Sequence, residues 1–189
     1  MIHVDDIFTS GEDDFQLDLV EKIKTRFRVS KDQKDNFTYT GMSVRTDGNG
    51  RIFLNQNQYA EELPSVSEDA EKETEEKKKM TLRGVVGRLL YLNLTRPDLS
   101  FKTNLLSRIP AGTDLDAKIK DAREIVELAR KTPLEIKYGK LGALNKLTLE
   151  VHADASFGGI DKGLRSSEGF VIFLKGENNR CAPVAWRLE

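Results

Sequence analysis

The stretch LRGVVGRLLYLNLTRPDLSF, residues 82–101, decides the fold class because it predicts two helices on either side of a proline. Its apolar residues recur at intervals of three and four positions, which predicts an amphipathic helix over residues 82–94. Proline lacks the backbone N–H that a helix interior needs, so Arg96-Pro97-Asp98 marks a break, and a second helix is expected as far as Ser107. The apolar side of the first helix comprises Leu82, Val85, Val86, Leu89 and Leu90.

The residues after this stretch predict a third helix over residues 114–131. Three amphipathic helices in succession imply a small bundle or a helical layer against a sheet. The stripe of the third helix comprises Leu115, Ile119, Ala122, Val126 and Ala129.

Beyond Pro133 the pattern changes to that of β-strands. Residues 147–152 alternate between apolar and polar, whereas residues 169–174 form a continuous apolar run and residues 182–188 a third strand-like segment. Glycine-containing turns separate these runs, which favours an antiparallel meander. We expect Phe170 and Trp186 in the core of this sheet.

The first third of the chain predicts a strand, a helix and a hairpin. Residues 2–9 form a short apolar strand around an aspartate pair, and residues 12–28 carry apolar side chains at helical spacing. Strands are expected over residues 37–45 and 51–55, because TDGNG between them supplies residues that tolerate positive φ. A short helix, residues 56–63, ends before Pro64.

The segment SVSEDAEKETEEKKK, residues 65–79, allows two interpretations. Glutamate and lysine recur at four-residue spacing, which can support a solvated helix. A mobile charged linker is the alternative, because apart from Val66 and Ala70 the segment has no apolar side.

Composition limits the classes of function. The 30 Lys and Arg residues nearly balance 31 Asp and Glu, so the net charge of −1 provides no global attraction for nucleic acid or anionic membranes. Cys181 is the only cysteine, which excludes an internal disulfide and a cysteine-rich zinc site. No apolar run approaches the roughly 20 residues that span a bilayer. We therefore expect an intracellular protein, cytoplasmic or nuclear, without membrane contact.

Asp5 and Asp6 are the first candidates for chemistry. A tight turn between two short strands exposes both carboxylates, and such a turn can hold Mg²⁺. In a two-metal site the ions activate the attacking oxygen and stabilise the leaving oxygen. Chemistry of this kind needs a third carboxylate from another element, and a plain surface turn remains the alternative.

The start MIHVDDIF resembles the YVDD box of reverse transcriptases, with His3 where that family commonly has tyrosine. The chain beyond this box is similar, in order, to the Pol polyprotein of copia-type (Pseudoviridae) LTR retrotransposons. The resemblance covers nearly the whole chain apart from the charged segment. The matching segments are YTGMSV (39–44), IFLNQNQYAEEL (52–63), RGVVGRLLYLNLTRPDLSF (83–101), NLLSR (104–108), ADASFGG (153–159), RSSEGFVIFL (165–174) and VAW (184–186).

The resemblance implies an α+β fold in four parts. Residues 1–64 would be a partial reverse-transcriptase palm, residues 65–79 a charged linker, residues 80–140 a helical thumb or connection, and residues 141–189 a truncated ribonuclease H-like sheet. We expect that sheet to have an open edge, along which a second copy of the chain pairs into a homodimer.

The resemblance also implies a set of site residues. Asp5 and Asp6 correspond to the paired metal-binding carboxylates of the palm, and Asp154 to the first-strand aspartate of ribonuclease H. The implied cofactor is Mg²⁺, or Mn²⁺, and the implied partner is an RNA/DNA template-primer. Without the resemblance, Asp154 is interpreted as a turn aspartate. Residues that would lie close to the template-primer are Arg83, Arg88, Arg96 and Lys102.

The resemblance finally implies that neither catalytic site is complete. In this family another palm aspartate lies upstream of the VDD box, and a glutamate and two aspartates of ribonuclease H lie downstream of the third strand. We therefore expect weak metal binding and no catalysis by the chain alone. The alternative is a domesticated, non-catalytic module that binds nucleic acid or protein.

Overall fold

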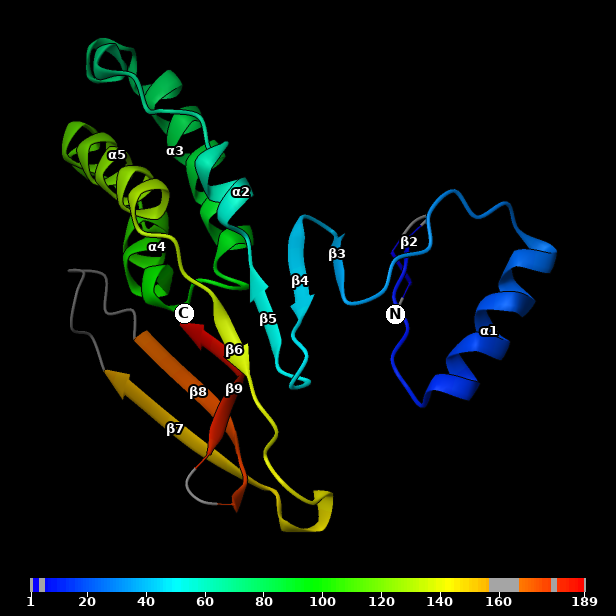
Figure 1. The fold of residues 1–189 in the computed structure, drawn as a ribbon. Helices are drawn as coiled ribbons and strands as arrows, with labels where there is room; N and C mark the ends of the chain where they lie inside the picture. Colours follow the sequence, from blue (N-terminus) through cyan, green and yellow to red (C-terminus); the bar gives the residue numbers. More distant parts are fainter. Residues whose placement is uncertain (1, 4–5, 157–166, 178–179, 189) are drawn as a thin grey trace.

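The computed structural model describes residues 2–3, 6–156, 167–177 and 180–188, which form helices and antiparallel sheets (Figure 1). This mixture agrees with the predicted α+β class. None of the helices in the described part of the chain is both long and apolar enough to cross a bilayer.

The main hydrophobic core lies between three helices, as predicted. They are α3 (Glu75–Leu92), α4 (Ser100–Ser107) and α5 (Leu115–Lys131), with the short α2 (Asn57–Glu61) packed beside α5. A 3₁₀ turn, η2 (Pro97–Leu99), separates α3 from α4 at the predicted proline break. The fully buried apolar side chains include Leu82, Leu89, Leu92, Leu99 and Ile119.

The charged segment is part of this helical unit. It contains a 3₁₀ turn, η1 (Glu68–Lys72), and the first turn of α3, so the helix begins seven residues earlier than predicted. The side chain of Arg123 on α5 donates to the backbone carbonyls of Val66 and Ser67 and pairs with Glu71 at 3.0 Å. The structure therefore favours the helical interpretation from Glu75 onward.

A four-stranded antiparallel sheet lies beside the helices (Figure 1). Its strands, in spatial order, are β3 (Asn36–Tyr39), β4 (Met42–Thr46), β5 (Ile52–Asn55) and β6 (Ile136–Tyr138). The β4–β5 turn is the predicted hairpin, and the hydrogen bond from the Arg51 side chain lowers the pKa of Asp47 in that turn to about 2.

Two details of this sheet differ from the prediction. The single strand expected over residues 37–45 is two strands, because Thr40 and Gly41 have positive φ and reverse the chain. The strand β6 comes from the segment after α5 and returns to pair with β5, so the helices are inserted within the sheet.

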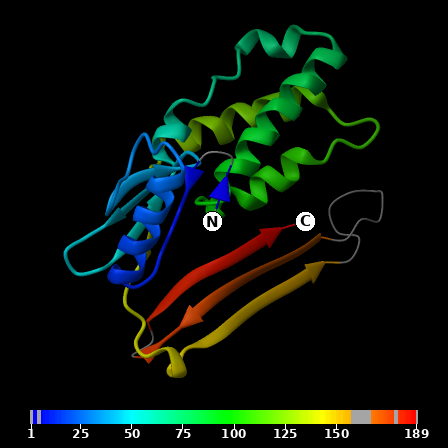
Figure 2. The same cartoon turned by 90° about the vertical axis from the view of Figure 1, so that its right-hand side faces the viewer.

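A second sheet is the predicted meander of three antiparallel strands. It consists of β7 (Thr148–Ser156), β8 (Ser167–Lys175) and β9 (Cys181–Leu188), preceded by a 3₁₀ turn, η3 (Leu144–Lys146). Figure 2 shows that β9 lies nearest the helices and β7 farthest from them. The sheet thus meets the helices with one edge, and Phe170, which was expected in its core, is 38% exposed.

The N-terminal part projects from the rest of the molecule (Figure 1). It contains a small hairpin of β1 (Ile2–His3) and β2 (Asp6–Ile7), followed by α1 (Asp13–Arg26). The helix is where it was predicted, but none of its residues is buried, and Phe15 is 59% exposed. Phe8 is the link to the four-stranded sheet, with its ring 5.7 Å from Phe37 and 5.6 Å from Tyr39.

Candidate nucleic-acid interface and carboxylate positions

The aspartate pair lies at the N-terminal hairpin. His3 and Asp6 are cross-strand partners in the antiparallel pair of β1 and β2. Asp6 is exposed, whereas Asp5 lies outside the described residues. Asp6 is therefore accessible to solvent, and a metal-binding role for the pair stays a prediction.

Asp154 lies near the end of β7, opposite Gly169 on β8. Its side chain is exposed, and its Oδ1 accepts a hydrogen bond from the backbone N–H of Ala155 at 2.9 Å. Strand alternation places Glu150 and His152 on the same face of β7 as Asp154.

These neighbours do not act as free metal ligands. Glu150 accepts a hydrogen bond from Lys175 at 2.7 Å and contacts His152 at 2.9 Å. The hydrogen bond from Lys175 lowers the pKa of Glu150 most, and the contact with His152 lowers it further. The hydrogen bond to Glu150 raises the pKa of Lys175. Glu150 and His152 are thus occupied by each other and by Lys175.

The predicted carboxylates lie apart. Figure 1 shows the N-terminal hairpin and β7 on opposite sides of the molecule, with the four-stranded sheet between them. Among the described residues, no three His, Cys, Asp or Glu side chains lie close enough together to hold a metal ion. The resemblance assigns Asp6 and Asp154 to two different sites, and each of these sites needs several ligands at one place for two-metal phosphoryl transfer.

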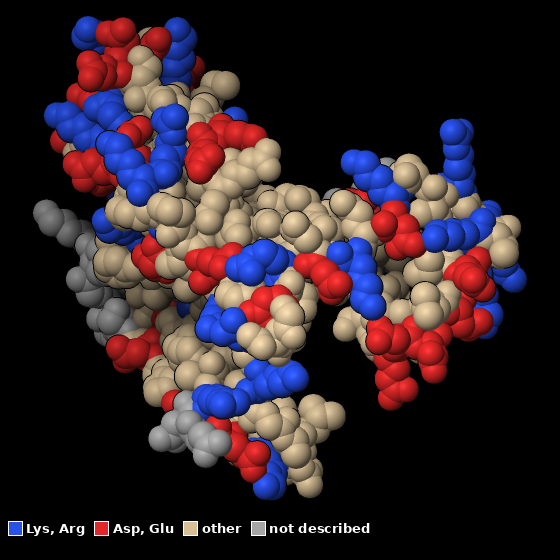
Figure 3. All heavy atoms as spheres, in the orientation of Figure 1, with Lys and Arg blue, Asp and Glu red and all other residues tan. Residues whose placement is uncertain are grey.

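Three of the four predicted basic residues are exposed. Arg83 and Arg88 lie on α3 and Lys102 lies on α4. Arg88 extends along its own helix, with Nη1 donating to the carbonyl of Gly84 at 3.4 Å. Figure 3 shows positive and negative side chains intermixed over the helices, so any nucleic-acid contact on this face has to be local.

Arg96 is a correction to the predicted basic set. Its side chain is buried, at 2% relative exposure. Its Nε and Nη2 donate to Asp98 at 2.9 and 2.8 Å, Nη1 donates to the carbonyl of Ala129 at 3.2 Å, and Nη2 donates to the hydroxyl of Thr132 at 3.2 Å. These contacts are internal, so the structure takes Arg96 out of the surface available to a phosphate.

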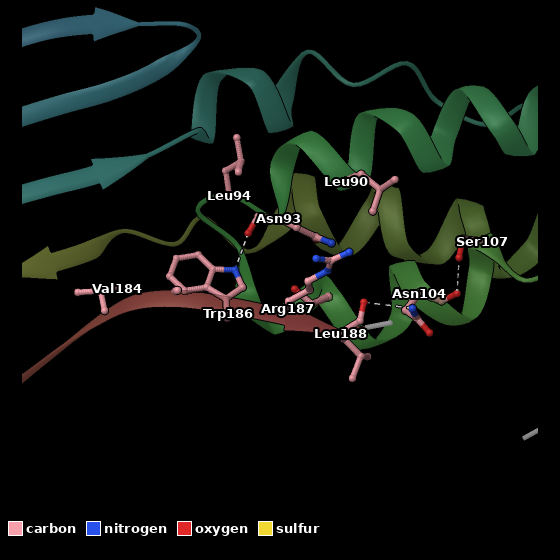
Figure 4. Close-up of a pocket in the computed structure, with 11 residues that line it drawn as sticks. Leu90, Asn93, Leu94, Asn104, Ser107, Val184, Trp186, Arg187 and Leu188 are labelled. Carbon is pink, nitrogen blue, oxygen red and sulfur yellow. Dashed lines mark hydrogen bonds between the residues drawn. The ribbon is translucent and has the colours of Figure 1, made fainter. Parts of the chain in front are cut away.

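An open groove with a volume of about 510 Å³ lies between α3, α4 and β9 (Figure 4). It was not predicted from the sequence. Leu90 and Leu94 form part of its wall, at 55% and 53% exposure. On the opposite side the indole N–H of Trp186 donates to the carbonyl of Asn93 at 2.7 Å. The groove lies between segments about 90 residues apart in the chain, and local periodicity does not predict that such segments meet. The sequence feature that could have indicated the groove is the single tryptophan, Trp186.

Comparison with known proteins gives distant relatives. No protein-family profile and no solved structure matches the chain. The retrovirus-related Pol polyproteins from transposons RE1 and RE2 of Arabidopsis thaliana are each 27% identical over 98% of this chain, which spans 13% of their length. The uncharacterized mitochondrial protein AtMg00810 of the same plant is 25% identical over 98% of this chain, and 80% of it is covered. The chain is thus similar, almost from end to end, to a small part of retrotransposon Pol polyproteins.

Proposed function

We propose that this chain is a retrotransposon-derived Pol segment of copia type, in which the end of reverse transcriptase runs into the start of ribonuclease H. The similarity over 98% of the chain to transposon Pol polyproteins supports this proposal. The order of elements agrees with it: an aspartate hairpin, a small sheet, three helices and a three-stranded meander. The ancestral reactions are template-directed DNA synthesis and cleavage of the RNA strand in an RNA/DNA hybrid.

The catalytic residues in this proposal are Asp5, Asp6 and Asp154. Mg²⁺ bound in a complete enzyme would stabilise the charge that develops on the transferring phosphoryl group. Asp5 and Asp6 would form part of one metal site and Asp154 part of another, and each site needs further ligands to hold the metal. We therefore expect the isolated chain neither to extend a primer nor to cleave a hybrid.

The property retained by the isolated chain would be contact with the nucleic-acid backbone. The observation that carries this inference is the solvent-facing side of α3, where Arg83 and Arg88 flank Gly84 and Gly87. A Cβ added at Gly87 would meet nothing within 4 Å, so packing within the chain does not require this glycine. Glycine in a helix lets another backbone approach closely, and arginine supplies the charge that phosphates bind. Lys102 on α4 is a third exposed cation for the same partner.

The test measures binding of the intact chain to a fluorescent RNA/DNA hybrid by anisotropy at several salt concentrations. In the double variant R83E/R88E we expect the dissociation constant to rise by about tenfold or more, with a shallower salt dependence, because phosphate contacts are lost.

The matched control is K22E/R26E, which makes the same change in net charge on the exposed helix α1. The dissociation constant of the control is expected to stay within about twofold of that of the unchanged chain, allowing for general repulsion by the added negative charge. Equal weakening by both double variants, or no binding by the unchanged chain, would contradict the α3 interface.

A non-catalytic binding module, located in the cytoplasm or the nucleus, is the second candidate. The observation that favours it is that no three potential metal ligands lie together among the described residues, and that Glu150 and His152 contact each other. Primer extension and hybrid cleavage by the isolated chain in Mg²⁺, with D5N and D154N as controls, test the non-catalytic role. Activity that these substitutions abolish would refute the non-catalytic role.

A further inference from the structure

The strand β7 forms a long open edge of the three-stranded sheet. It is nine residues long, and no strand in the described part of the chain pairs with its outer side. The opposite edge, β9, lies against the helices, and Asn104 donates to the backbone carbonyl of Leu188 there at 3.2 Å. Figures 1 and 2 agree that β7 is the strand farthest from the helices.

The edge lacks proline, lysine and a bulge, three of the features that prevent strand pairing, and its charged residues are Glu150 and Asp154. Edge strands are commonly protected by proline, lysine or a bulge. The sequence of β7, TLEVHADAS, contains neither proline nor lysine, and its pairing with β8 is regular along all nine residues. Two apolar side chains on one face are exposed, Leu149 at 66% and Val151 at 58%. This edge therefore exposes both backbone hydrogen-bonding groups and apolar surface.

We propose that β7 pairs antiparallel with β7 of a second copy of this chain, about a two-fold axis at Val151. The two meanders would then form one continuous six-stranded sheet. The inference rests on the geometry of β7 and does not depend on the proposed function.

The side chains of β7 are self-complementary in this register. With the axis at Val151, Val151 faces its own copy and Leu149 faces Ala153 on one side of the sheet. On the other side, Glu150 faces His152 of the other copy, twice per dimer. Opposed pairs of this kind stabilise neighbouring strands, whereas like charges in opposition destabilise them.

Neighbouring registers are less favourable. An axis at His152 places Glu150 opposite Asp154, and an axis at Glu150 places two Glu150 side chains face to face. Both put carboxylates in opposition. An axis at Ala153 pairs His152 with Asp154 but leaves Leu149 outside the paired part of β7, which would be residues 150–156. Because a seven-residue strand interface is small, we expect a reversible dimer.

The experiment is sedimentation equilibrium of the full chain over a range of concentrations, with two matched valine variants. V151K changes the centre of the edge, and V184K changes a valine of β9 that is 48% exposed in the same sheet. We expect the unchanged chain to dimerise reversibly, V151K to raise the dissociation constant by about tenfold or more, and V184K to leave it unchanged, because lysine protects edges. Circular dichroism melts identify variants that remain folded.

The variants H152K and H152E test the register. Each leaves the backbone edge in place and changes the charge that faces Glu150 of the other copy, beside the contact that residue 152 makes with Glu150 of its own chain. H152K should retain or tighten the dimer and H152E should weaken it. A monomer at all concentrations, polydisperse aggregation, equal effects of V151K and V184K, or equal effects of H152K and H152E would overturn the proposal.

Discussion

The guanidinium of Arg96 connects the turn between α3 and α4 to the end of α5. The carbonyl of Ala129 belongs to the last turn of α5, where intrahelical donors are missing, and Arg96 supplies one. A cation at a helix C-terminus also interacts favourably with the helix dipole. Asp98, Thr132 and Ala129 together accept all the hydrogen bonds described for this side chain.

Replacing Arg96 by alanine is expected to lower the free energy of unfolding by about 2–3 kcal/mol, because buried acceptors lose a charged donor. The matched control is R83A on the exposed side of α3, expected to change the same quantity by less than about 0.5 kcal/mol. Urea denaturation followed by circular dichroism measures both. Equal stability of the two variants would mean that the Arg96 contacts contribute nothing net.

Individual residues show where prediction from sequence stops. The resemblance placed Arg96 at a nucleic-acid surface and the strand pattern placed Phe170 in a core, but Arg96 is buried and Phe170 is exposed. The buried environment of Arg96 depends on α5, more than 30 residues away, and the exposure of Phe170 depends on how sheet and helices meet. Neither factor is present in local sequence.

At the scale of single elements, the interior of α3 contains Gly84 and Gly87. Glycine in a helix costs conformational entropy on folding relative to alanine. A Cβ at Gly87 has open space around it, whereas one at Gly41 would lie 3.0 Å from the hydroxyl of Tyr91, at a φ of +78°.

The substitution G87A is therefore expected to raise the free energy of unfolding by about 0.5–1 kcal/mol. The control G41A is expected to lower the free energy of unfolding, because alanine is strained at the positive φ of this position. Both are measured by thermal or urea unfolding. A destabilising effect of G87A would show that the helix cannot accept a side chain at this position.

Elements with strong periodicity were predictable and short ones were not. The helices α3, α4 and α5, the β4–β5 hairpin and the meander are all confirmed. The strand β6 has only three residues, too few for a period, and pairs with a strand about 80 residues earlier. The early start of α3 depends on its first turn and η1 packing against α5, through contacts such as Arg123 to Glu71.

At the scale of the whole molecule, stability is unevenly distributed. The core lies among α2, α3, α4 and α5, whereas α1 buries no residue and exposes Phe15, Leu17 and, just after its end, Phe27. Local opening is easiest where few apolar contacts are lost.

Native-state hydrogen exchange is expected to show amide protection in α3 and α5 that exceeds that in α1 by about two orders of magnitude or more. Mass spectrometry of peptides from each helix measures it, and the unfolded chain provides the reference rates. Similar protection in α1 would indicate that its apolar side is covered in solution.

For the candidate sites, the sequence suggests residue types but not their arrangement in space. A resemblance along the chain can assign Asp5, Asp6 and Asp154 to metal chemistry, because motifs are local. How far apart the two predicted sites lie depends on the path of the chain between them, and the structure places β2 and β7, the strands that carry Asp6 and Asp154, on opposite sides of the four-stranded sheet.

The hydrogen bond from Trp186 to Asn93 has a spectroscopic consequence. This indole is the only one in the chain, and it lies where β9 meets the end of α3. Emission excited at the indole band therefore comes from a single position, and a red shift would report water entering between the second sheet and the helices. Separation of those two layers can thus be followed without a label and distinguished from loss of helix seen by circular dichroism.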